Sequence, residues 1–449
     1  MTHYIEQSKN KVKIAVNASS YDKIIFTGNG CSGAVNHLIH CLDLRLKKHQ
    51  TTPPDTVIFL SRAEHHSNFL PYCHLNVKLI YVPLLDTGLI DMSFLEKELR
   101  KHQRYPKIYV SFNAVSNVTG TIQNVDTICQ LVHHYKGMIF FDYAAGAPYI
   151  PINMHKDDSQ GMYMDAIFFS THKFFGGPGS PGVLVANQSI FKNEIPYCPA
   201  GGTVRFVCPQ FQTYSNNIEV KETGGTPDII GSIKIGLIFD LKTRYQDFIL
   251  KRDRFILTKV QKQLQTIHNL KLLNPVENLH RMPVFVFLIN HIHYNLVVVL
   301  LNDLFGIQTR GGISCCSLLA QDLLHLNSEQ QQHIYQQIIT DKGVPSNYGW
   351  CRVSFHYSMP DFIIDYIIKA IIFVAQYAHY FKRVYKYYPE KNNWLYCPTG
   401  CPWDDFSQIS LSLDSTETPS TIYLTPQILR DQFQVAMDII SDIQKYQRL

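Results

Sequence analysis

The chain has 449 residues, of which 45% are apolar and 17% are charged, so it can form a sizeable core and is too apolar for a disordered protein. Its 41 Lys and Arg exceed its 36 Asp and Glu by five, and these residues are spread along the chain, so no nucleic-acid partner is expected. The chain does not begin with a signal-peptide-like segment, and its most apolar stretch, 362–381, carries Asp365 and Lys369. We therefore expect a buried helix there and no membrane association.

The first 240 residues alternate strand-like and helical patterns. The strand-like segments are Asp22–Gly28, Thr56–Arg62, Val77–Leu84, Lys107–Asn113, Met138–Tyr143, Ala166–Ser170 and Gly182–Asn187. Helical patterns lie between them at 32–48, 92–101 and 125–135. Continuously apolar strands that alternate with helices are typical of a parallel sheet covered on both faces. The sequence therefore predicts an α/β three-layer sandwich with a mostly parallel sheet, which binds its ligand at the rim where the strands end.

A second, smaller α+β domain follows a long helical pattern from 228 to 270. Its strand-like segments are 283–290, 306–310 and 350–356, and its helices are 294–304 and 361–381. The segment 385–425 is polar and contains scattered Pro, Gly and Ser, which indicates a surface insertion. We therefore predict a large domain at 1–245, a small domain at 246–384, the insertion at 385–425 and a C-terminal helix at 426–449.

The 11 cysteines are ordinary for a reduced compartment, and no pair has a convincing zinc spacing. We therefore expect no metal site and a cytoplasmic location.

Three features at the predicted strand ends could carry chemistry. The small-residue loop Asn29–Ala34 opens a helix, where backbone N–H groups can bind an anion, although Ser32 could equally be a plain helix cap. Asp142 ends an apolar strand, as either a buried functional acid or a residue that stabilises the next turn. Lys173 lies between a strand and a glycine-rich turn, where it could be a Schiff-base lysine or a solvated loop residue. Together the three match the needs of pyridoxal phosphate: a phosphate site, an acid for the ring nitrogen and a lysine.

Four motifs in register extend this interpretation to a family. They are Glu64–Asn68 (EHHSN), Val115–Gly120 (VSNVTG), Ser170–Lys173 (STHK) and Gly224–Pro227 (GGTP). From about residue 22 to residue 381, the chain resembles the fold-type I, class V pyridoxal-phosphate enzymes, which include cysteine desulfurases and selenocysteine lyases. The resemblance implies this fold, pyridoxal 5'-phosphate as cofactor and a small amino acid as substrate.

The resemblance also implies a role for each matching residue. Lys173 would form the Schiff base and move the Cα proton, Asp142 would pair with the ring nitrogen, and His65 would stack on the ring. Asn117 would lie beside the ring or the substrate carboxylate. The phosphate would be bound by Gly30, Cys31, Ser32, Ser170 and His172. Thr226 would reach the phosphate in the other subunit, which implies a homodimer with shared active sites.

Two further matches concern the reaction. Cys315, in Gln308–Cys316 (QTRGGISCC), falls on the reactive cysteine of the desulfurases, although either it or Cys316 could be presented. Its thiolate would accept sulfur from cysteine and release alanine, and a sulfur-acceptor protein would then take the persulfide sulfur. Arg352 matches the arginine that binds the substrate carboxylate, for which a planar guanidinium is well suited. The favoured function is therefore C–S or C–Se bond cleavage of the desulfurase type.

The sequence departs from the family pattern in two places. Ala145 stands where the family has a glutamine that reaches the cofactor's phenolic oxygen, and the usual N-terminal segment does not precede the first strand. Two alternatives therefore stay open: a class V aminotransferase or other lyase that does not use Cys315, and a truncated, non-catalytic paralogue. If an N-terminal segment is missing, the location could be an organelle.

Overall fold

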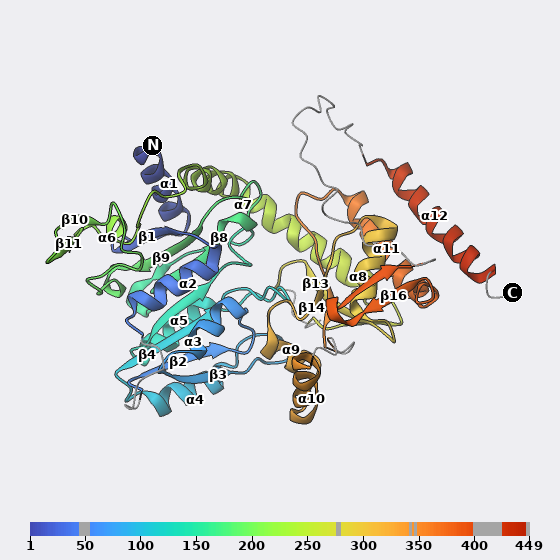
Figure 1. The fold of residues 1–449 in the computed structure, drawn as a ribbon, viewed down its shortest axis with the longest axis horizontal. Coiled ribbons are helices and arrows are strands. Elements are labelled where there is room, and N and C mark those ends of the chain that lie inside the picture. Colours follow the sequence, from blue (N-terminus) through green and yellow to red (C-terminus); the bar gives the residue numbers. More distant parts are fainter. Residues whose placement is uncertain (45–53, 275–279, 341–343, 345–347, 398–423, 446–449) are drawn as a thin grey trace. The chain divides into compact units, whose positions relative to one another are not determined.

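The computed structural model describes the whole chain except residues 45–53, 275–279, 341–343, 345–347, 398–423 and 446–449. Its contacts divide the chain into two units (Figure 1). The first unit contains Met1–Leu257, Pro275–Val284 and Cys315–Leu319, and the second contains Thr258–Asn274, Phe285–Ser314 and Ala320–Leu449. The Cys315–Leu319 segment therefore belongs to the same unit as Asp142 and Lys173.

A seven-stranded sheet in the order β1-β9-β8-β5-β4-β2-β3 forms the centre of the first unit. The strands are β1 (Asp22–Thr27), β2 (Thr56–Ser61), β3 (Lys78–Val82), β4 (Lys107–Asn113), β5 (Met138–Asp142), β8 (Ala166–Ser170) and β9 (Gly182–Asn187). Strands β3, β2, β4, β5 and β8 are paired in parallel, whereas β9 is antiparallel to both of its neighbours. The carboxyl ends of β5 and β8, which carry Asp142 and Ser170, therefore point to the same edge.

Helices cover both faces of this sheet, as Figure 1 shows. One face packs against α1 (Thr2–Ala15), α4 (Met92–His102), α5 (Val125–His134) and the first half of α7 (Ile229–Leu264). The other face packs against α2 (Gly30–Cys41) and α3 (Leu70–Cys73). Successive residues of β8, such as Phe168 and Phe169, lie in the two opposite cores and are fully buried. This double burial explains the continuous apolar runs, and it confirms the predicted three-layer α/β sandwich.

The second unit is built on a four-stranded sheet in the order β12-β13-β15-β14. Its strands are β12 (Leu270–Leu272), β13 (Val284–Ile289), β14 (Arg310–Gly312) and β15 (Trp350–Ser354), and its helices include α8 (Tyr294–Phe305), α10 (Ser328–Ile339), α11 (Asp361–Phe381) and α12 (Pro426–Lys445). The antiparallel hairpin of β16 (Tyr385–Tyr388) and β17 (Asn393–Tyr396) follows α11. The hairpin occupies the first part of the predicted insertion, whereas 398–423 lie outside the described residues.

Smaller elements complete the two units. They are β6 (His155–Asp157), β7 (Met162–Tyr163), β10 (Val204–Val207), β11 (Gln212–Tyr214), α6 (Ile218–Lys221) and α9 (Ser317–Leu323), with short 3₁₀ turns that include His66–Asn68 and Thr171–Lys173. Among the described helices, α11 alone is long and apolar enough to span a membrane, and 56% of its most apolar window is buried within the protein. Burial of this kind is also found in core helices of soluble proteins, so composition alone does not assign α11 to a membrane.

Candidate active site

The N-terminus of α2 meets the loop after β8 in a tight backbone cradle. Gly30 has φ +59°, and a Cβ placed on it would lie 2.7 Å from His172 Cε1 and 2.8 Å from Ser170 Oγ. The backbone N–H of Cys31 donates to Ser170 Oγ at 2.8 Å. Because a helix N-terminus presents N–H groups and partial positive charge, this arrangement suits an anionic group such as a phosphate.

A serine pair links the same helix start to the Glu64–Asn68 motif. Ser32 Oγ lies 2.6 Å from Ser67 Oγ. His65 is half-buried, and its Nδ1 accepts the backbone N–H of Ser67 at 3.1 Å. His65 therefore caps the short turn that follows it, and this hydrogen bond fixes the position of one ring nitrogen.

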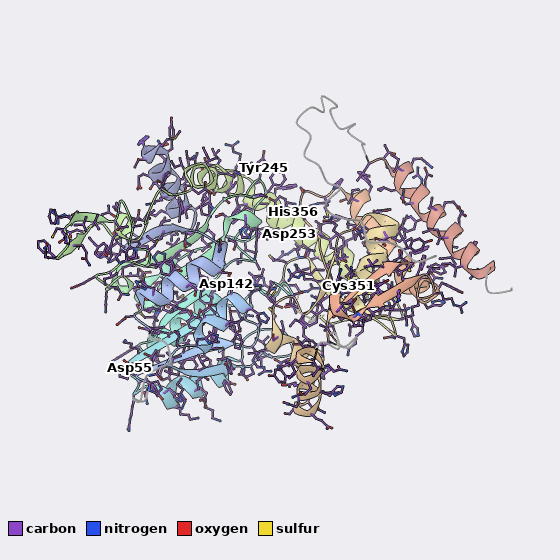
Figure 2. All side chains as sticks on the ribbon, viewed as in Figure 1. Asp55, Asp142, Tyr245, Asp253, Cys351 and His356 are labelled. Carbon is purple, nitrogen blue, oxygen red and sulfur yellow. The ribbon has the colours of Figure 1, made fainter. Side chains whose placement is uncertain are left out.

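Asp142, which is labelled in Figure 2, is a buried acid at the end of β5. Burial raises the pKa of Asp142 above its ordinary value, while the backbone N–H of Ala144, the charge of Lys173 and the thiol of Cys31 act in the opposite direction. Burial likewise raises the pKa of the Cys31 thiol well above its ordinary value, and Asp142 adds to this effect. Cys31 is therefore a neutral thiol, whereas Lys173 is exposed and supplies positive charge to the site.

A buried network supports the site, and the sequence did not predict it. The Glu64 carboxylate accepts hydrogen bonds from Ser61 Oγ at 2.5 Å, Asn68 Nδ2 at 2.7 Å and the Asn113 backbone N–H at 2.8 Å. Burial raises the pKa of Glu64 to about 8, although these hydrogen bonds lower it. Asn68 Oδ1 in turn accepts from Ser111 Oγ at 2.8 Å. The network holds the start of the Glu64–Asn68 motif against β4.

The segment that begins at Cys315 is docked against two of the motifs. The backbone N–H of His66 donates to the Cys315 carbonyl at 2.8 Å, and His66 Nε2 lies 2.6 Å from Ser317 Oγ. The Cys316 thiol is fully buried and donates to Asn117 Oδ1 at 3.0 Å. Cys315 is partly exposed. Of the two adjacent cysteines, Cys315 is therefore the more exposed.

The other predicted residues are placed as follows. Thr226 is exposed in the loop before α7. Ala145 is half-buried after β5, with no amide to reach a ligand. Arg352 lies on β15 in the second unit, opposite Arg310 of β14 in the sheet register. The structure thus brings together Gly30, Cys31, Ser32, His65, Asn117, Asp142, Ser170, His172, Lys173 and Cys315 in one unit and places Arg352 in the other.

The residues present fit pyridoxal phosphate. The cradle at Gly30 leaves no room for a side chain and presents the Cys31 end of α2, as a phosphate site requires. A buried acid and an exposed lysine follow neighbouring strands of the same sheet. An acid for a ring nitrogen and an amine for a carbonyl carbon are the two other groups that this cofactor needs.

Comparisons with known proteins agree with this arrangement. The family model for Aminotransferase class-V matches residues 1–366. A probable cysteine desulfurase of Streptomyces coelicolor is 27% identical over 319 residues, which cover 70% of this chain and 73% of that protein. A probable cysteine desulfurase of Halalkalibacterium halodurans is 28% identical over 319 residues, with the same coverage.

Solved structures show the same fold. A cysteine desulfurase from Thermococcus onnurineus superposes with a TM-score of 0.68 at 22% identity and covers 84% of each chain. A cysteine desulfurase of Escherichia coli gives a TM-score of 0.66 at 21% identity, again over 84% of each chain. The chain therefore belongs to the aminotransferase class-V family of pyridoxal-phosphate-dependent enzymes and is a cysteine desulfurase-like member of it.

Proposed function

We propose that this enzyme binds pyridoxal phosphate and cleaves the C–S bond of L-cysteine, releasing alanine and leaving a persulfide on Cys315. The observation that carries the proposal is the docking of the cysteine-bearing segment against the Glu64–Asn68 and Val115–Gly120 motifs. Hydrogen bonds at His66 and Asn117 fix this segment on both sides. The partly exposed Cys315 thiol is thus held in the same unit as Lys173 and Asp142.

The residues of the site divide the work among them. The N-terminus of α2, with Ser170 and His172, would bind the phosphate, and Asp142 would pair with the ring nitrogen. When bound, pyridoxal phosphate supplies an electron sink for the bonds broken at the substrate Cα. Lys173 would hold the cofactor and take up and return the Cα proton. Arg352 would bind the substrate carboxylate in a bidentate pair.

The sulfur transfer needs the Cys315 thiolate as its only sulfur acceptor. This thiolate forms an S–S bond with the substrate sulfur while the Cβ–S bond breaks, and Cβ keeps the electron pair and takes a proton. Cysteine and an enzyme thiol thus give alanine and an enzyme persulfide, with no external oxidant or reductant. Selenocysteine would react in the same way through its C–Se bond.

An absorbance spectrum of the protein supplied with pyridoxal phosphate tests the first half of the proposal. A visible band should be present in the native protein and in Lys192→Ala, which changes an exposed lysine outside the site. The band should be lost in Lys173→Ala. A band that persists in Lys173→Ala would refute the role of this lysine, and no band in the native protein would favour the non-catalytic alternative.

Alanine release from cysteine tests the second half. Cys315→Ala should abolish alanine release and persulfide formation while the Lys173-dependent band remains. Cys316→Ser, the matched control, keeps a hydrogen-bond donor for Asn117 Oδ1 and should keep the persulfide on Cys315. Unchanged alanine release in Cys315→Ala would favour the aminotransferase or other-lyase alternative.

The proposal also includes a homodimer in the cytoplasm and a sulfur-acceptor protein. Thr226 lies exposed in a loop, where a second subunit could contact it. Light scattering should then give twice the chain mass of 51.7 kDa. A monomer that still forms the Lys173-dependent band would contradict shared active sites.

A further inference from the structure

The second unit contains a cavity that the proposed reaction does not use. The cavity has a volume of about 820 Å³, within the range of small-molecule sites. It is lined by the end of β13, the turn before α8, the α9–α10 region, and both strands of the β16–β17 hairpin. All of its lining residues belong to the second unit, so the cavity does not depend on how the units are placed.

Three side chains of this cavity carry a buried polar atom without a hydrogen-bond partner among the described residues. They are Nε2 of His293, Oε1 of Gln337 and Nε1 of Trp394. His293 is only 8% exposed. Buried polar groups in folded proteins are nearly always hydrogen-bonded, and each exception calls for an explanation. Of the three, His293 and Trp394 lack an acceptor, which a ligand with acceptor oxygens would supply.

The hydrogen-bonding character of these atoms can be assigned. Nδ1 of His293 accepts the backbone N–H of Asn295 at 3.0 Å, so the neutral ring carries its proton on Nε2. Burial lowers the pKa of His293 to about 4, so the ring is neutral near pH 7. The indole of Trp394 is also a donor. The residues that line the cavity therefore include two that carry neutral N–H donors, His293 and Trp394, and one that carries an amide acceptor, Gln337.

The walls of the cavity favour a planar, negatively charged molecule. The rings of Tyr387 and Trp394 lie 5.3 Å apart, and His293 lies 4.9 Å from Tyr387 and 5.9 Å from Trp394. Lys271 and Lys382 also line the cavity, and none of the described lining residues is acidic. Aromatic faces stack on planar rings, while ammonium groups and N–H donors bind carboxylate oxygens.

We propose that this cavity is a second binding site, separate from the proposed catalytic reaction, for a small aromatic carboxylate. The carboxylate accepts the N–H groups of His293 and Trp394 and neutralises Lys382, and its ring stacks on Tyr387. The β16–β17 hairpin is therefore one wall of a binding site. The site requires no activity at Lys173, so its test is independent of the proposed function.

Calorimetric titration of the full chain, saturated with pyridoxal phosphate, with 2-naphthoate tests this proposal. One saturable site is expected, and uncharged 2-naphthalenemethanol should bind at least tenfold more weakly. Trp394→Phe keeps the ring and removes one donor, so affinity for naphthoate should fall about five- to tenfold. Lys382→Met should weaken naphthoate binding and leave binding of the alcohol unchanged.

The matched control is Lys386→Met, which removes a lysine from the same hairpin at an exposed position that does not line the cavity. Its affinity for naphthoate should equal that of the native chain. Circular dichroism identifies any variant that fails to fold, and Lys382→Met then stands in for Trp394→Phe. The proposal is overturned if the native chain shows no saturable naphthoate binding. It is equally overturned if folded Trp394→Phe and Lys382→Met bind naphthoate as the native chain does.

Discussion

Substitution of Gly30 by alanine tests whether the start of α2 is a phosphate cradle. Gly30 has φ +59°, a conformation that costs an L-residue about 1 kcal/mol or more. The new Cβ would lie 2.7 Å from His172 Cε1 and 2.8 Å from Ser170 Oγ, so both side chains must shift. A shift of Ser170 breaks its 2.8 Å bond from the Cys31 N–H, which contributes about 1 kcal/mol. We therefore expect a loss of about 2–3 kcal/mol in unfolding free energy.

Gly28→Ala is the matched control, because nothing lies within 4 Å of a Cβ placed at Gly28. Urea unfolding of the cofactor-free proteins measures the stability term, and titration with pyridoxal phosphate measures the affinity. Gly30→Ala should bind the cofactor at least tenfold more weakly than Gly28→Ala, since Ser170 and His172 have moved. Equal cofactor affinities of the two variants would refute the phosphate cradle, even if Gly30→Ala is less stable.

Three other changes probe buried and half-buried charges by urea unfolding. Burial raises the pKa of Glu64 to about 8, so as the pH rises the unfolded chain loses this proton before the folded chain does. The unfolding free energy of the native protein should therefore fall relative to that of Glu64→Gln between pH 4.5 and 8. A difference between the two proteins that stays constant over this range would contradict the raised pKa. The hydrogen bond to Asp22 raises the pKa of His155 to about 9, so the contribution of His155 to the unfolding free energy is complete below pH 6.5 and is lost as the pH rises through 9. His155→Gln should abolish this fall of the unfolding free energy with pH. His37→Ala removes the partner that lies 3.0 Å from the buried Glu222 carboxylate and helps to lower its pKa. The unfolding free energy at pH 7 should therefore fall by about 3 kcal/mol. A fall of less than about 1 kcal/mol would show that this pair does not stabilise the fold.

The sheet of the first unit could be predicted because its sequence pattern has one physical cause. Each predicted strand there agrees with an observed strand to within two residues at either end, since strands buried on both faces must be continuously apolar. The antiparallel direction of β9 was not predicted, because Gly182–Asn187 is as apolar as its parallel neighbours. The direction of a strand within a sheet depends on the connection that leads into it, and a local sequence pattern does not indicate this.

The features that the sequence did not predict depend on contacts between distant segments. Helix α1 was not predicted, because its mostly polar sequence buries only Ser8 and Val12. The β16–β17 hairpin was read as part of a polar insertion, although Tyr387 and Trp394 pair across it. The Glu64 network had one visible signal, an acid and an amide four residues apart. Its partners on β4 come from nearly fifty residues away, beyond the reach of local spacing.

The choice between Cys315 and Cys316 shows why a motif alone cannot assign a reactive atom. Adjacent cysteines have the same intrinsic chemistry, so only the backbone decides which thiol faces outward. Here Cys315 has φ +59°, which is uncommon for a residue with a side chain, and the His66 N–H holds its carbonyl at 2.8 Å. Cys316 then bonds to Asn117 in the interior. Alanine at Cys315 keeps the same backbone cost and removes the thiol, whereas glycine would also relieve φ. The loss of activity in Cys315→Ala therefore reports on the thiol itself.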